Sequence, residues 1–214
     1  MENKKYVLTD KTKEIYGHIL HRIKAIKDFG DVKKDDLGGW IETESNLSQF
    51  SNCWIYDNAI VCENANVRDN AIVCGNVIVY GEACIWDNAK VRGSAIICDK
   101  VQISEYACIR DYANVYGHVS IRDYAVVRGN VKVYGEAIIC GGAKIESDKD
   151  YAVFKNTWSS GRYFTWTRSN NKWKVGCFYG SGEELIAKAY ADNEKKGKCY
   201  EAIVKAQELI SNIK

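Results

Sequence analysis

Three arginines, Arg92, Arg110 and Arg128, recur at an interval of eighteen residues. The planar guanidinium fork of arginine suits phosphate and carboxylate groups. If residues eighteen apart lie one above another, these side chains form a basic column, and their charges repel unless anions or carboxylates lie between them. The column therefore predicts a strip that binds a phosphate or a carboxylate. The alternative is a solvated face that is neutralised by Asp111 or by a partner chain.

A second group combines aromatic rings with arginine. Trp86 and Arg122 stand two intervals of eighteen apart, and Tyr106 and Tyr124 stand one interval apart. Aromatic rings beside a guanidinium could stack a nucleotide base and clamp its phosphate. The alternative is a ladder of arginine and aspartate in which the tyrosine rings stack on one another. Such a ladder stabilises the fold and binds nothing.

The interval of eighteen derives from a six-residue repeat that runs from Ile55 to Ile145 without insertion or deletion. Its sixteen aliphatic anchors are Ile55, Val61, Val67, Val73, Val79, Ile85, Val91, Ile97, Ile103, Ile109, Val115, Ile121, Val127, Val133, Ile139 and Ile145. A small apolar residue stands four residues after each anchor up to Ile139. A fixed period of this kind indicates that each unit is one structural step.

Each unit predicts a short strand and a corner. In the unit that begins at Val67, strand alternation points Ala71 and Val73 inward. The pair Asp69-Asn70 makes the corner, because Asp, Asn and Gly accept the left-handed conformation. Three units would close a triangular coil, and coils would stack at roughly 4.8 Å. We therefore predict a mainly β fold with about five triangular parallel coils over residues 47–148.

The pattern aliphatic-x-Asp/Gly-Asn-Ala/Val-x, over roughly residues 46–147, resembles the hexapeptide repeat of left-handed parallel β-helix proteins. The resemblance implies left-handed coils, and the best-known members are trimeric acyltransferases and related sugar-nucleotide enzymes that bind ligands between subunits. The position after the anchor is often Gly in those enzymes, whereas here it carries Tyr, Cys, Arg or Trp. The segments Asp36–Glu42 and Asn46–Ser48 resemble uncharacterised bacterial and prophage-type hexapeptide-repeat proteins rather than a named enzyme.

An acyltransferase of this type would use a histidine as general base near its cofactor groove. His118 would take that role if a neighbouring chain completed the pocket. The alternative is a structural polar corner, because the same repeat slot holds Glu82, Lys100 and Glu136. The other two histidines, His18 and His21, fall in the N-terminal segment.

Residues 1–46 lack the repeat and predict an N-terminal β cap, since a solenoid must cover its exposed strand edges. We expect a strand within Ile19–Ile26 and a tight turn at Gly38-Gly39.

Residues 149–214 predict a small C-terminal α+β domain. The aromatic segments 163–168 and 173–178 predict a β-hairpin, and two helices follow it. The first helix is predicted to open with a capping box from Ser181 to Glu184 and to end at Gly197.

One predicted side is apolar outside as well as inside in its first three coils. The outward residues there are Ile60, Cys62, Ile78, Tyr80, Ile96 and Cys98. A patch of this kind indicates burial by a symmetry-related chain, by the N-terminal cap or by the C-terminal domain. We favour a homo-oligomer, and analogy with the resembled enzymes favours a trimer.

Composition limits the remaining function classes. The net charge of +2 disfavours binding of extended nucleic acid. There is no apolar run of membrane-spanning length and no hydrophobic signal segment. The nine cysteines are odd in number and five of them occupy repeat positions, which argues for reduced thiols rather than a disulfide framework. The absence of Cys-x-x-Cys and His-x-x-x-His spacings argues against a structural zinc site. We expect a cytoplasmic protein without metal, cofactor or membrane contact.

Together these patterns predict a non-catalytic oligomeric protein that binds a small anionic ligand. A nucleotide signal sequestered by a prophage-type protein is the concrete form of this hypothesis. The first alternative is an acyltransferase that uses an acyl-CoA-like donor. The second alternative is a rigid scaffold that presents the C-terminal domain to a protein partner.

Overall fold

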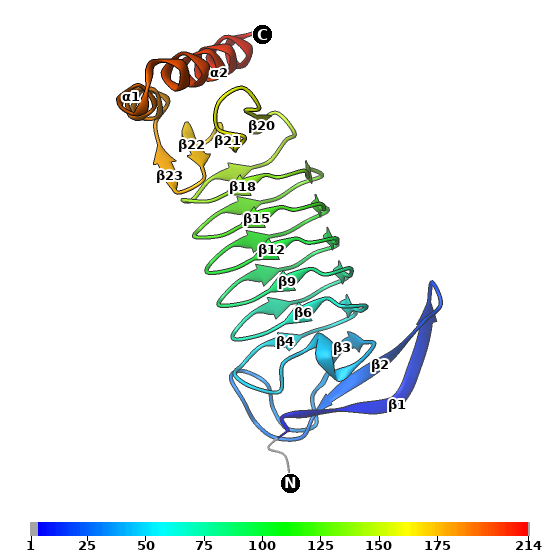
Figure 1. Cartoon of the computed structure of the whole chain (residues 1–214). Helices are drawn as coiled ribbons and strands as arrows, with labels where there is room; N and C mark the ends of the chain where they lie inside the picture. Colours follow the sequence, from blue (N-terminus) through cyan, green and yellow to red (C-terminus); the bar gives the residue numbers. More distant parts are fainter. Residues whose placement is uncertain (1–3, 214) are drawn as a thin grey trace.

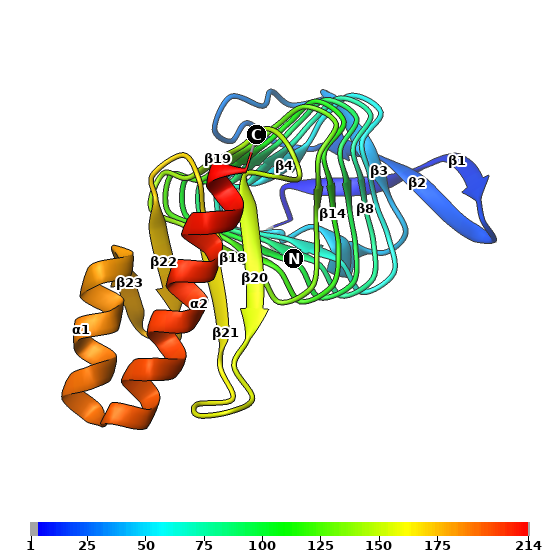
Figure 2. The same cartoon turned by 90° about the horizontal axis from the view of Figure 1, so that it is seen from above.

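The computed structural model describes residues 4–213 of the chain. A triangular β-solenoid forms the body, with a β cap at its N-terminal end and an α+β domain at its C-terminal end (Figure 1). Viewed along the axis, the coils lie over one another and a long hairpin projects from the solenoid (Figure 2). This arrangement confirms the predicted mainly β fold with parallel coils and caps at both ends.

The solenoid strands are two residues long and form three parallel sheets, one on each side. The first side holds β4 (Trp54–Ile55), β7 (Ile72–Val73), β10 (Lys90–Val91), β13 (Cys108–Ile109), β16 (Val126–Val127) and β19 (Lys144–Ile145). The second side holds β5 (Ile60–Val61), β8 (Ile78–Val79), β11 (Ile96–Ile97), β14 (Asn114–Val115) and β17 (Lys132–Val133). The third side holds β6 (Asn66–Val67), β9 (Cys84–Ile85), β12 (Gln102–Ile103), β15 (Ser120–Ile121) and β18 (Ile138–Ile139).

The register of these sheets confirms the interval of eighteen residues. Val91, for example, pairs with Val73 on one side and with Ile109 on the other. The anchors and the small residues between them point inward and form one continuous buried core. The narrow interior explains why a small residue, most often Ala, precedes the solenoid strands, because a larger side chain there would overpack the coil.

The corners adopt the left-handed conformation that the sequence predicted, with positive φ at Asp57, Asp99 and Asp111 among others. Many acidic corners also bond to the next coil. The Asp99 carboxylate accepts the N–H of Gly117 at 2.8 Å, and that of Asp111 accepts the N–H of Gly129 at 3.0 Å. These contacts add a side-chain hydrogen bond between coils at positions where the strands have ended.

Outside the bonds between paired strand residues, the backbone ladder has one prevailing direction, since its N–H groups donate to the carbonyls of the next coil. Trp54 N–H donates to Ala71 and Ile72 N–H donates to Ala89, for instance. The last coil therefore has N–H groups without a following coil, and side-chain oxygens of the C-terminal region accept them. The pairs are Lys132 with Asp148, Tyr134 with Tyr151, Ile138 with Thr165, Lys144 with Ser169 and Glu146 with Asp150.

At the N-terminal end of the solenoid, the carbonyls of the first coil have no preceding coil to donate N–H groups to them. The Asn46 amide donates to the carbonyls of Glu63 and Ala65, at 2.9 and 2.8 Å. Lys5 is 1% exposed, and its ammonium donates to three carbonyls at the solenoid's entrance. These belong to Phe50, Ser51 and Cys53, at 3.2, 3.1 and 2.8 Å. A buried cation thus closes this end of the ladder.

The N-terminal cap consists of β1 (Tyr6–Ile15), β2 (His18–Ala25), β3 (Leu37–Ile41) and the short 3-10 helix η1 (Glu44–Asn46). β1 and β2 form an antiparallel hairpin, and β3 joins the hairpin to the second side by pairing in parallel with β5. The strand predicted within Ile19–Ile26 is confirmed as β2.

The turn predicted at Gly38-Gly39 is wrong, because both glycines lie inside β3. A Cβ on Gly38 would come within 2.6 Å of the Ile23 and Trp54 side chains, and one on Gly39 within 2.4 Å of the Ile55 side chain. The glycines are needed for close packing of the cap on the first coil rather than for a turn.

The C-terminal domain has the antiparallel strands β20 (Tyr151–Lys155), β21 (Tyr163–Thr167), β22 (Lys172–Val175) and β23 (Phe178–Gly180), followed by α1 (Gly182–Asp192) and α2 (Glu194–Asn212). The predicted hairpin is confirmed as β21–β22 and belongs to a sheet of four strands. The capping box is confirmed as well, since the Ser181 hydroxyl accepts the N–H of Glu184 and the Glu184 carboxylate accepts the N–H of Ser181.

The helix end predicted at Gly197 is wrong. The two helices separate at Asn193, whose side chain caps α2 by accepting the N–H of Lys196. Gly197 lies inside α2, and a Cβ there would come within 2.3 Å of the Tyr190 ring. The glycine therefore permits close packing of α1 against α2.

All nine cysteines are free thiols. Within residues 4–213, neither helix is long and apolar enough to cross a membrane.

The role of the Lys5 ammonium as a donor to the carbonyls at the solenoid entrance can be tested with Lys5→Met. This variant keeps the apolar stem and removes the ammonium. Three carbonyls then lose a buried donor, so we expect the free energy of unfolding to fall by about 2–4 kcal/mol. Chemical denaturation measures the change. The matched control is Lys33→Met, which removes an exposed ion pair with Asp28 and should cost less than about 1 kcal/mol. Equal losses in the two variants would contradict the role of Lys5.

Candidate functional site

A cleft lies between the β1–β2 hairpin and the second side of the solenoid. It encloses about 430 Å³. Ile60, Ile78 and Ile96 from three successive coils form one wall, and Ile15 and Leu20 from the hairpin form the other. A concave, mostly apolar hollow with few polar groups is the usual form of a small-molecule site.

The cleft exists because the cap covers the apolar second side only in part. Leu20 and Trp40 of the cap pack against the first coil at Ile60 and Cys62. The sequence left open whether a symmetry-related chain, the N-terminal cap or the C-terminal domain covers this side. On the first coil, the N-terminal cap covers it. Further along the same side, Ile96 is 37% exposed. The hairpin therefore stands over an apolar surface that continues beyond it.

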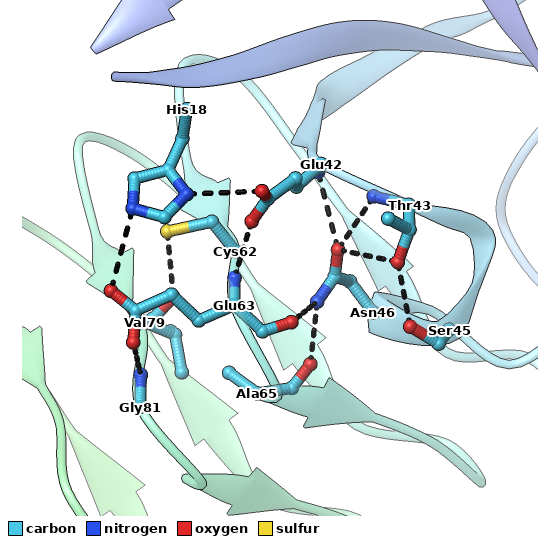
Figure 3. Close-up of polar contacts among 10 residues, drawn as sticks. All are labelled: His18, Glu42, Thr43, Ser45, Asn46, Cys62, Glu63, Ala65, Val79 and Gly81. Atoms are coloured by element: carbon cyan, nitrogen blue, oxygen red, sulfur yellow. Dashed lines mark hydrogen bonds and ion pairs between the residues drawn. The ribbon is translucent and has the colours of Figure 1, made fainter. Parts of the chain in front are cut away.

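His18 and Glu63 line the cleft, and the carboxylate of Glu42 contacts His18 (Figure 3). His18 begins β2, Glu42 directly follows β3, and Glu63 occupies the left-handed corner after β5. His18 Nδ1 lies 3.0 Å from Glu42 Oε1, and His18 Nε2 lies 3.7 Å from Glu63 Oε1. The imidazole thus lies between two carboxylates contributed by different parts of the chain.

Backbone donors hold both carboxylates in place. Glu42 Oε2 accepts the N–H of Glu63 at 2.7 Å, and Glu63 Oε2 accepts the N–H of Gly81 at 3.0 Å. Each carboxylate therefore keeps its other oxygen directed to His18. The arrangement is fixed by the cap on one side and by a solenoid corner on the other.

The charges of the three groups support one another. The hydrogen bond to Glu42 raises the pKa of His18, and the same bond lowers the pKa of Glu42. Because Glu42 engages Nδ1, the neutral imidazole carries its proton on Nδ1 and leaves Nε2 as the basic nitrogen. This is the arrangement of a general base oriented by a carboxylate.

Two other chemistries do not fit the cleft. Burial raises the pKa of the Cys62 thiol to about 11, so it is not a thiolate nucleophile at neutral pH. Among residues 4–213, no group of three or more His, Cys, Asp or Glu side chains could hold a metal ion.

The sequence did not assign a function to His18. Its contacts with Glu42 and Glu63 join residues that are far apart in the chain, so no local spacing shows them. One signal was available at Glu63. The left-handed solenoid corners carry Asp or Gly almost throughout, and Glu occurs there only at Glu63 and Glu105. A longer carboxylate at a corner indicates that the side chain reaches beyond the usual contact with the next coil.

The structure places Arg92, Arg110 and Arg128 in one column on the first side, as predicted from their interval. Arg128 Nε bonds to Glu146 at 2.9 Å, and Arg92 is exposed. Arg110 Nε is buried and has no hydrogen-bond partner among the described residues. Ligand binding by this column stays a prediction, and Arg110 is the member whose hydrogen bonding is incomplete.

The aromatic group on the third side is largely occupied by its own neighbours. The Tyr106 and Tyr124 rings stack with centroids 5.1 Å apart and planes 6° apart, which leaves no gap between them for a base. The Arg68 guanidinium lies over the Trp86 ring at 5.2 Å. Arg122 lies near the carboxylates of Glu105 and Asp123, and the hydrogen bond between these two raises the pKa of Glu105. The stacked ladder matches the stabilising alternative, and binding at Trp86, Tyr106, Arg122 and Tyr124 stays a prediction.

His118 lies at an exposed corner, with Nδ1 3.6 Å from Glu136 Oε1. It borders a shallow hollow with polar corner residues such as Glu82 and Lys100. Within this chain it therefore has no apolar wall of the kind that surrounds His18.

The electrostatic link between His18 and Glu42 can be tested by NMR titration. Wild-type His18 is expected to titrate above 6.5, and Glu42→Gln should lower its pKa because the amide cannot stabilise the imidazolium as the carboxylate does. His118 serves as an internal control, because its ion-pair partner Glu136 is unchanged in the variant. An unchanged His18 pKa in the variant would show that the pair does not form in solution.

No family model matches the chain. A stretch of 43 residues is 56% identical to a protein of Escherichia coli (strain K12) named "Uncharacterized acetyltransferase YdcK". That stretch is 20% of this chain and 13% of the relative, so the chain matches only a small part of the relative's length. The uninterrupted six-residue repeat and the triangular parallel coils give the chain the fold of the hexapeptide-repeat, left-handed parallel β-helix superfamily.

Proposed function

We propose that this protein is an acyltransferase that moves an acyl group from a thioester donor to a small acceptor bound in the cleft under the hairpin. The observation that carries the proposal is the His18–Glu42 pair beside an apolar cavity. The similarity of 43 residues to a protein named as an acetyltransferase supports the same reaction class.

The cleft supplies what acyl transfer needs from a protein. The acceptor must lose a proton as it attacks the thioester carbonyl, and His18 Nε2 is the basic nitrogen that can take it. Glu42 is a positioning residue, because it holds the ring through Nδ1 and stabilises the imidazolium that forms. The proton then passes to the leaving thiolate as the carbon–sulfur bond breaks. The apolar walls exclude water that would otherwise hydrolyse the thioester.

The proposal predicts that His18→Gln removes transfer while keeping the fold. A screen with acetyl-CoA against amine and hydroxyl acceptors, read by free-thiol release and mass spectrometry of the product, should detect activity in the wild type. His18→Gln should lower kcat/KM by about 10²–10⁴, the usual contribution of a general base.

The control is His118→Gln, which changes the histidine that the sequence alone favoured for this reaction. It should leave kcat/KM unchanged. Loss of transfer in His118→Gln with full activity in His18→Gln would move the reaction to the solenoid corner and contradict the assignment to the cleft.

A second candidate function is non-catalytic binding of a small anion, such as a nucleotide, along the arginine column. It is supported by the Arg110 Nε atom, which is buried and has no partner among the described residues. A phosphate that displaced the groups covering this atom would satisfy it, and Arg92 is exposed one coil away to share the charge.

Isothermal titration with cyclic nucleotides and ADP-ribose tests this candidate. If the column binds, Arg110→Gln should weaken the affinity by about tenfold or more, since a charge-assisted hydrogen bond contributes about 1.5–3 kcal/mol. Arg162→Gln, which changes an exposed arginine of the C-terminal domain, is the matched control and should have no effect. Absence of binding by the wild type would remove the candidate.

A further inference from the structure

We infer that the cleft selects a primary amine with a compact, uncharged apolar body. As an acyl acceptor, this ligand rests on the proposed function. As a binding partner, it rests only on the geometry of His18, Glu63 and the cavity.

The gap between His18 and Glu63 has the size of one bridging atom. Nε2 and Oε1 are 3.7 Å apart, which is too far for a direct hydrogen bond. An atom placed between them can nevertheless lie about 2.9 Å from both. Both flanking atoms are acceptors when Nδ1 carries the imidazole proton, so the bridging atom must donate twice.

A nitrogen satisfies this requirement and a hydroxyl does not. A primary amine or its ammonium carries two or three hydrogens, whereas a hydroxyl carries one and would leave an acceptor unpaired. The carboxylates of Glu42 and Glu63 also favour a positive charge at this position. Neither can turn away freely, because each is held by a backbone N–H of the solenoid.

The rest of the cleft defines the body of the amine. Besides His18 and Glu63, the lining residues are aliphatic, tyrosine or a neutral thiol. No cation among them could pair with a carboxylate on the ligand, and Glu63 would repel one. The volume of about 430 Å³ lies at the small end of ligand sites. An aliphatic or aromatic monoamine therefore fits, and an amino acid does not.

The transfer step is balanced with such an acceptor. The ammonium gives one proton to His18 Nε2, and the neutral nitrogen attacks the thioester carbonyl of the donor. A carbon–nitrogen bond forms and the carbon–sulfur bond breaks. His18 passes its proton to the leaving thiolate, and the surplus proton on the new amide nitrogen goes to solvent. The products are an amide and a free thiol.

Paired ligands that differ in one atom test the inference on the full chain without any acyl donor. Phenethylamine and hexylamine should bind at least tenfold more tightly than 2-phenylethanol and hexanol in isothermal titration. Equal affinity within the pairs, or no binding by either amine, would overturn the inference.

Variants locate the effect. Glu63→Gln keeps an acceptor for the Gly81 N–H and removes the charge. It should therefore lower the affinity for the amines at least tenfold and leave the affinity for the alcohols unchanged. Glu82→Gln removes an exposed corner carboxylate outside the cleft and should change nothing. An equal loss in both variants would assign the preference to general charge rather than to the gap beside His18.

The outcomes for binding and for transfer are separate. Amines that bind and are never acylated by any thioester would refute the proposed function and keep the ligand class. Acylation of alcohols in preference to amines would keep the function and overturn the ligand class.

Discussion

The direction of the parallel backbone ladder is the constraint on which this structure depends. Outside the paired strand residues, each coil donates N–H groups to the next coil, so these N–H groups lack acceptors at one end of the solenoid and the matching carbonyls lack donors at the other. The C-terminal region supplies the missing acceptors with side-chain oxygens such as those of Asp148 and Thr165. The N-terminal cap supplies the missing donors with the Asn46 amide and the buried ammonium of Lys5. The two caps differ in chemistry because the ladder they close has two different ends.

The candidate site follows from how the N-terminal end is closed. β3 continues the second sheet by donating backbone N–H groups to the first coil, including that of Trp40 to Ala59 at 2.8 Å. This pairing fixes Glu42 beside the corner at Glu63. The β1–β2 hairpin extends the same sheet and then projects from the solenoid (Figure 2). His18, at the start of β2, lies in the cleft with Ile60 and Ile78 of the apolar second side. The cleft therefore lies where the cap departs from the repeat.

The repeat made most of the fold predictable, because every anchor and corner is specified by residues within a few positions of it. The interval of eighteen also placed the arginine column and the Tyr106–Tyr124 stack. Gly38 and Gly197 were misassigned, since the local rule treats glycine as a breaker and their role is to permit close packing with distant side chains. His18 was missed for the same physical reason. Its partners are set by the packing of the cap, which no local pattern encodes.

Regular columns on a solenoid tend to satisfy themselves. At a fixed coil spacing, like groups can stack or bond to the equivalent residue of the next coil, as the Asn52–Asn70–Asn88 amides and the Tyr116–Tyr134 rings do. A group that the column already satisfies has little left to offer a ligand. Apart from Arg110 Nε, the unmet bonding capacity described above lies where the period is broken. The long corner carboxylate of Glu63 and the imidazole brought in from the cap are such a break, and this is the physical reason to place the chemistry in the cleft rather than on a repeated face.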